Sequence, residues 1–100
     1  MKNIFVAAIH SKNKVRVEFY SKDDSSVITR VCAPMDYGPS RKFKDGIDRY
    51  HLWDYDSDNG PHTLSLPDNQ ISKIEVMDDS FDPKEFVTWP ENWIIPRNWA

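Results

Sequence analysis

Cysteine, glycine and long apolar runs are all scarce in this 100-residue chain. The single thiol, Cys32, rules out an internal disulfide, so a reducing compartment fits best and we expect a cytoplasmic protein. Three dispersed glycines rule out a glycine-rich phosphate loop. The apolar run at residues 4–9 is far shorter than the roughly 20 residues of a membrane-spanning helix. We therefore expect neither a targeting segment nor a membrane partner.

The spacing typical of metal ligands is missing as well. Alternating carboxylates begin a calcium-loop pattern at Asp54, Asp56 and Asp58. Its sixth and twelfth positions are Asn59 and Ser65, whereas such a loop needs a glycine and a bidentate glutamate there. We interpret the run as an acidic hairpin turn at Asn59-Gly60. The three histidines and the cysteine show no zinc spacing, so we expect no metal and no cofactor.

No pattern in the sequence assembles catalytic groups. Cys32 lies between Val31 and Ala33 in a predicted strand, without a glycine-rich turn to present it as a nucleophile, so we expect a buried structural thiol. Carboxylates are common, but nothing pins two of them in one apolar cleft. We therefore expect that the protein is not an enzyme.

The net charge of −3 is unevenly distributed. Residues 1–50 carry ten lysines and arginines against six acidic residues, whereas residues 51–100 carry three against ten. The densest basic group consists of Arg41, Lys42, Lys44 and Arg49. Two interpretations remain open, a patch that contacts an anion and a solvated face. The interruption of this group by Asp36, Asp45 and Asp48 favours the solvated face.

Five segments have the character of β-strands. In residues 14–20 and 27–33, side chains alternate between an apolar and a polar face, which is typical of half-buried strands. Pro34 is expected to end the second strand, because it has no amide donor, and residues 35–48 are predicted to form a long loop. The other strands are predicted at residues 48–55, 62–66 and 71–77. Apolar residues at helical spacing predict a short helix at residues 2–10.

These segments predict a single domain, residues 1–100, with a mainly β fold. Five short strands with tight turns favour a small antiparallel, SH3-like or Sm-like barrel, because closure removes exposed strand edges. The barrel would span about residues 4–81. A tryptophan-rich tail, about residues 82–100, would pack on it.

The tail holds three tryptophans within eleven residues: Trp89, Trp93 and Trp99. One interpretation is that they pack on the barrel, with Trp89 and Trp93 substantially buried, since exposed aromatic patches are rare on monomers. The other is that they anchor a partner, because tryptophan is enriched at interface hot spots. We favour packing.

The order of the segments resembles the WYL domain, a small SH3-like or Sm-like β-barrel of bacterial regulators. The likeness extends from about Ile4 to Phe81. It depends on the short first helix, on residues 14–20 and 29–34, on Tyr50-His51-Leu52, and on Leu64-Ser65-Leu66 leading to Ile71 and Ile74. The Trp-Tyr-Leu that gives the family its name is replaced by Tyr50-His51-Leu52. An arginine that the family associates with ligand binding is replaced by His62.

The resemblance implies a non-catalytic, regulatory binding module. The ligand we expect is small and anionic, or resembles a nucleotide or nucleic acid, and the candidate recognising groups are Arg30, Arg49, His51 and His62. The alternative is a protein–protein interaction module, including a homodimer, which would use a sheet edge or the tail residues Trp89, Trp93 and Trp99.

Overall fold

The computed structural model describes residues 1–57 and 60–99. It contains one α-helix, five strands and two 3-10 turns in the order α1 (Lys2–Ser11), β1 (Asn13–Ser21), β2 (Ser26–Pro39), β3 (Asp48–Asp54), β4 (His62–Pro67), η1 (Asp68–Gln70), β5 (Ile71–Ser80) and η2 (Pro83–Glu85). The predicted helix and all five predicted strands are confirmed. The predicted turn at Asn59-Gly60 lies partly outside the described residues. No helix in the described part of the chain is long and apolar enough to cross a membrane.

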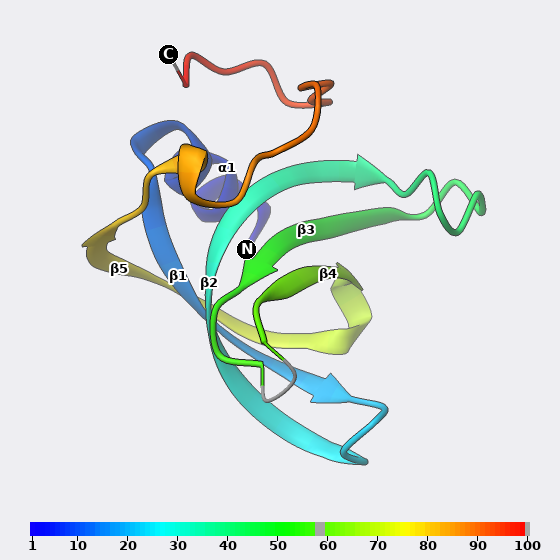
Figure 1. The fold of residues 1–100 in the computed structure, drawn as a ribbon. Coiled ribbons are helices and arrows are strands. Elements are labelled where there is room, and N and C mark those ends of the chain that lie inside the picture. Colours follow the sequence, from blue (N-terminus) through cyan, green and yellow to red (C-terminus); the bar gives the residue numbers. More distant parts are fainter. Residues whose placement is uncertain (58–59, 100) are drawn as a thin grey trace.

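The strands form one antiparallel sheet in the order β4-β3-β2-β1-β5, which bends strongly across its width (Figure 1). The predicted closure into a barrel is wrong: β4 and β5 are the two edges of an open sheet. The physical reason is that helix α1 takes part in filling the core. Its residues Phe5, Ala8 and Ile9 are fully buried against the sheet. Burial by a helix thus replaces the backbone pairing that would have closed a barrel.

Strand β2 continues past Pro34, where the sequence predicted its end. Residues 26–31 of this strand pair with β1, Cys32 pairs with both β1 and β3, and from Ala33 onward the strand pairs with β3 alone. The missing amide of Pro34 therefore removes no bond to β1. A register shift between Pro34 and Asp36 follows directly. The far half of β2 thus has one side free, and the predicted loop at residues 35–48 is shortened to the stretch between Pro39 and Asp48.

The core divides into two groups of buried side chains. The larger lies between α1 and the sheet and includes Val15, Cys32 and Tyr50. Burial raises the pKa of the Cys32 thiol, which agrees with a structural role. The smaller lies beyond it, around Met35 and Phe86. Trp99 packs against both groups, and so ties the end of the chain to the whole core.

Candidate functional site

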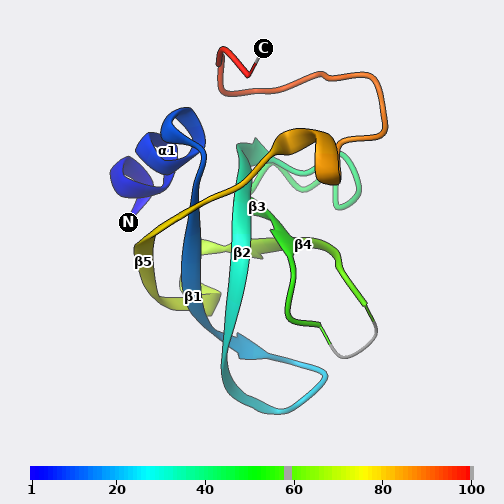
Figure 2. The same ribbon diagram turned by 60° about the vertical axis from the view of Figure 1, so that its left-hand side comes forward.

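The tail crosses the end of the sheet near α1 and the far half of β2 (Figure 2). It has no helix or strand after η2, and every residue from Val87 to Trp99 is exposed or half-buried. The expectation that Trp89 and Trp93 are substantially buried is therefore only partly met. Trp93 is half-buried, whereas Trp89 is 39% exposed. Trp89 is more exposed than expected because its ring packs against another tail residue, Trp93, at 6.4 Å between ring centroids, and not against an aromatic ring of the sheet.

Four groups fix the tail to β2, and we call them the latch: the Asp36 and Arg97 side chains and the backbone amides of Ile94 and Ile95. Ile94 N and Ile95 N donate to the two carboxylate oxygens of Asp36, at 2.8 and 2.9 Å. Arg97 Nη2 donates to the same carboxylate at 3.1 Å. The same carboxylate also accepts from the amide of Tyr37, its neighbour in β2, at 3.0 Å.

Arg97 is the most enclosed side chain of the tail, with 1% of its side chain exposed. Its guanidinium lies between the rings of Trp93 and Trp99, at 4.2 and 4.4 Å from their centroids. It also donates to the Met35 carbonyl, on the side of β2 that β1 leaves free. Burial lowers the pKa of Arg97 to about 10, while the nearby Asp36 carboxylate opposes this shift. Arg97 therefore stays charged at neutral pH.

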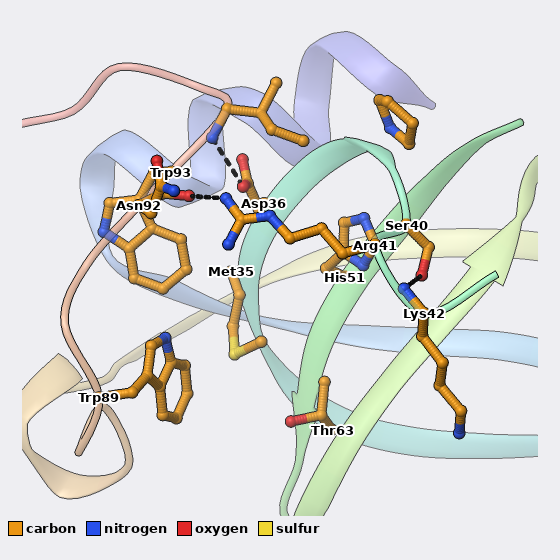
Figure 3. A pocket seen from close by; sticks show the side chains of 12 residues that line it. Met35, Asp36, Ser40, Arg41, Lys42, His51, Thr63, Trp89, Asn92 and Trp93 are labelled. Carbon is orange, nitrogen blue, oxygen red and sulfur yellow. Dashed lines mark hydrogen bonds between the residues drawn. The ribbon is translucent and has the colours of Figure 1, made fainter. Parts of the chain in front are cut away.

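A cleft of about 270 Å³ opens between the tail and the far half of β2, and we call it the tail cleft (Figure 3). The tail contributes Trp89, Asn92, Trp93 and Ile94 to its lining. The opposite wall comes from β2 and the loop that follows it, and the floor includes His51 and Thr63. Two indole rings thus face a wall of mixed polarity across a space of small-molecule size.

Positive charge is concentrated on the loop side of the tail cleft. Arg41 and Lys42 both line it, and neither forms an ion pair with a described residue. Arg41 reaches across the cleft, where its Nη2 donates to the Asn92 carbonyl at 3.1 Å (Figure 3). The negative charge of Asp36 is balanced by Arg97. The cleft therefore carries a surplus of positive charge.

His51 lies on the floor of the tail cleft, but both of its ring nitrogens already have partners. Nε2 is 2.9 Å from the Gly38 carbonyl, which can only accept, so Nε2 carries the proton. Nδ1 then accepts from the Ser65 hydroxyl at 2.8 Å. His51 accordingly shapes the cleft with its ring and has no ring nitrogen free for a ligand.

Arg30 and His62 come together elsewhere, at a second cavity of about 190 Å³. Three carboxylates share its lining, those of Asp23, Asp24 and Asp54. Asp54 is buried, and its carboxylate lies 3.6 Å from the Arg30 guanidinium. The excess of negative charge makes this cavity a poor site for an anion.

The aspartates of the calcium-loop pattern have other partners where the structure describes them. Asp54 Oδ1 accepts from the amide of Asp56 at 2.8 Å. Asp56 Oδ2 in turn accepts from the amide of Val31 at 2.8 Å, which ties the acidic turn to β2. Asp58 lies outside the described residues. The first two carboxylates thus accept hydrogen bonds from backbone amides of the acidic turn and of β2.

Arg49 belongs to neither cavity. Its guanidinium donates two parallel hydrogen bonds to the carboxylate of Asp45, each 2.9 Å long, and lies 4.1 Å from the centroid of the Phe43 ring. The four predicted recognising groups are therefore spread over three places: Arg30 and His62 at the acidic cavity, His51 in the tail cleft, and Arg49 at the start of β3.

The pair formed by Asp45 and Arg49 leads to a prediction about pH. Hydrogen bonds from Arg49 lower the pKa of Asp45 from 3.8 to about 2. Because the folded pKa is the lower one, the stabilisation is present above about pH 4 and is lost as the pH falls towards 2. In Arg49→Gln, the pKa of Asp45 should rise from about 2 towards 3.8, with the remaining hydrogen bond from the Ile47 amide keeping part of the shift, as followed by carboxyl carbon chemical shifts. An unchanged low pKa in this variant would contradict the assignment.

Sequence reasoning identified His51, Trp89 and Trp93 as candidates but missed the other groups that build the tail cleft. Asp36 falls in a predicted loop, because the sequence predicts the end of β2 at Pro34. Arg41 and Lys42 were noticed only as part of a basic group. A usable signal for Arg97 was its position between Trp93 and Trp99, since aromatic rings on both sides favour a stacked guanidinium.

Comparisons with known proteins support the fold. No family model matches the chain, and no curated protein matches it significantly. A similar solved structure is proteasome accessory factor B/C (PafBC) of Arthrobacter aurescens, with a TM-score of 0.64 and 13% sequence identity. The match covers 98% of this chain but only 14% of PafBC. At this identity the likeness shows a shared fold alone, and it gives partial support to the WYL-like fold that the order of segments predicted.

Proposed function

We propose that this chain is a non-catalytic, regulatory binding module that holds a small anionic ligand with an aromatic ring, such as a nucleotide, in the tail cleft. The observation that carries the proposal is the pairing of Arg41 and Lys42 on one wall with Trp89 and Trp93 on the other. The shared fold with a segment of a regulator is compatible with such a role. PafBC's own activity is a separate matter, because the chain spans 14% of that protein.

The chemistry of the two walls is complementary to a nucleotide. An indole face stacks on a base, which is worth about 1–3 kcal/mol per base in single-stranded nucleic-acid sites. Lysine and arginine bind phosphate through charge-assisted hydrogen bonds. The volume of about 270 Å³ lies just below the range of roughly 300–1,000 Å³ for ligand pockets, so the cleft suits a ligand no larger than a mononucleotide.

A nucleophile or general base is not part of this proposal. His51 uses both ring nitrogens within the fold, and the Cys32 thiol is fully buried, with a raised pKa. Recognition without chemistry is the function that the lining of the tail cleft supports best.

The test is titration of the full chain with adenosine monophosphate, followed by calorimetry and by tryptophan fluorescence. We expect Lys42→Gln to weaken binding roughly tenfold, because one charge-assisted contact to the phosphate is lost. Trp89→Ala should weaken it by a similar factor, and Trp89→Phe should restore much of the loss. The measurement is the dissociation constant of each variant.

Lys44→Gln is the matched control, because Lys44 belongs to the same loop but does not line the tail cleft. Equal losses in Lys42→Gln and Lys44→Gln would point to general charge attraction and not to a site. Inorganic phosphate serves as a second probe. If phosphate binds as tightly as the nucleotide, the indole rings contribute nothing to the affinity for the ligand. A wild-type chain that binds neither probe would refute the proposal.

A second candidate function is protein–protein interaction through the tail. The observation that favours it is the exposure of two large apolar side chains there, with Trp89 39% and Ile94 45% exposed. This candidate predicts concentration-dependent self-association or partner binding that Trp89→Ala abolishes. Light scattering across a range of concentrations separates the two functions, since a small-ligand module needs no change in mass.

A further inference from the structure

The tail cleft has one wall that belongs to the sheet and one that belongs to the tail, and both depend on Asp36. This residue lines the cleft, and its carboxylate also accepts the hydrogen bonds from the Ile94 and Ile95 amides. In Figure 3, Asp36 lies where the tail passes over β2, beside Arg41 and Trp93. Movement of the tail therefore changes the cleft itself.

Few polar contacts hold the tail wall in place. Among the described residues 88–97 and 99, no backbone-to-backbone hydrogen bond joins the tail to the sheet. Besides the bonds within the latch, Arg97 donates to the Met35 carbonyl, Arg41 donates to the Asn92 carbonyl, and the Trp99 indole donates to the Ile9 carbonyl. Side-chain contacts of this kind form and break as a unit when a terminal segment docks or leaves.

The latch is suited to selecting one docked position, and adds little net stability. The attraction within a buried ion pair is largely offset by the loss of hydration of both partners. Arg97 shows this cost, since burial lowers its pKa despite the adjacent carboxylate. None of the residues from Val87 to Trp99 is fully buried as a whole. We therefore expect docking of the tail to be specific and reversible.

We propose that the latch controls the tail cleft, so that ligand binding and tail docking are one coupled equilibrium. The inference rests on the proposed function of the cleft. Arg97 acts as a positioning residue: it does not line the cleft, but it stacks on Trp93 and pairs with Asp36, and both of these residues do line the cleft. A ligand that binds only when both walls are present favours docking by the same factor by which docking favours the ligand.

The amides of Ile94 and Ile95 report on this equilibrium directly, because they donate to Asp36 only in the docked tail. We expect adenosine monophosphate at about 100 times its dissociation constant to slow hydrogen exchange of these amides by about 100-fold. In Arg97→Gln, exchange should be faster without ligand, and the apparent affinity should fall at least tenfold. Arg97→Lys keeps the charge but loses the planar guanidinium that stacks on the indole rings. The affinity of this variant for the nucleotide should therefore lie between those of the wild type and Arg97→Gln.

Gly38→Ala provides an independent route to the same result without altering charge. Gly38 has a φ of 148°, and a Cβ there would lie 2.6 Å from Ile94 Cδ1. The added methyl group should push the tail outward. We therefore expect faster hydrogen exchange at the Ile94 amide and weaker binding of the nucleotide. Far-UV circular dichroism checks that each variant keeps the sheet, and Lys44→Gln again serves as the variant that should change nothing.

The outcomes separate the two proposals. Wild-type protein that does not bind the nucleotide would overturn the proposed function, and the coupling with it. Binding that is equally tight in wild type, Arg97→Gln and Gly38→Ala would overturn the coupling alone. So would nucleotide binding that leaves exchange at Ile94 and Ile95 unchanged.

Discussion

Replacing Trp99 by alanine should lower the free energy of unfolding by about 3 kcal/mol, the lower end of the range for aromatic residues in a core. Trp99 packs against both groups of core side chains. Its ring lies 5.6 Å from Phe81 and 5.2 Å from Trp93 between centroids, and its indole nitrogen donates to the Ile9 carbonyl at 2.9 Å. The substitution would remove this packing and leave the Ile9 carbonyl with only the Lys12 amide, at 3.4 Å, as a hydrogen-bond donor among the described residues. Urea unfolding followed by circular dichroism measures the loss.

Trp89→Ala is the matched control for Trp99→Ala. The same residue type in the same tail is 39% exposed at position 89 and contacts only the Trp93 ring among the aromatic residues described. We expect its removal to cost less than about 1 kcal/mol, as for other exposed positions. Equal costs at the two positions would mean that the tail docks as one apolar surface, without the specific role that the structure gives Trp99.

Alternation of polar and apolar residues was enough to predict the strands, because it depends on burial of one face. Val15 and Val17 are fully buried, as the pattern in residues 14–20 requires. The pattern does not encode how many neighbours a strand has at each position. That is why Pro34 was misread: the effect of a missing amide depends on whether β1 lies beside it, and β1 does not.

Whether the sheet closes into a barrel could likewise not be predicted from the sequence. The same five strands form a barrel or an open sheet, depending on whether the two edges meet or another element fills the gap. Here Phe5 and Ile9 from α1 fill it. The helix was predicted, but the depth to which it inserts follows from tertiary packing and not from periodicity.

The candidate site was predicted less well than the fold, because charged residues were judged one at a time. Arg49 looked like a free cation in the sequence, yet Asp45 neutralises it through two hydrogen bonds. The charge of Arg30 is likewise offset, since three carboxylates line the cavity that this residue shares. The value of a cation for recognition depends on its partners, and here these partners include residues distant in the sequence. Arg97, which pairs with Asp36 across 61 positions of the chain, is the clearest case.

Replacing Asp36 by alanine should cost about 3 kcal/mol, the range in which one partner of a buried ion pair is removed. The variant leaves the Arg97 guanidinium between two indole rings without its carboxylate, and leaves the Ile94 and Ile95 amides without an acceptor. The cost has an upper bound, however. Once it exceeds the free energy of docking the tail, the tail detaches and Arg97 regains its hydration.

That upper bound makes the effects of the two latch residues non-additive. Arg97→Met removes the charge but keeps much of the side-chain volume, and alone it should cost about 2 kcal/mol, because Asp36 still accepts from three backbone amides. The double variant Asp36→Ala, Arg97→Met should cost about as much as Asp36→Ala alone, since neither an unpaired guanidinium nor an unpaired carboxylate remains. A double-mutant cycle by urea unfolding measures the coupling. Strictly additive losses would show that Asp36 and Arg97 stabilise the chain independently, and would contradict a latch that acts as one unit.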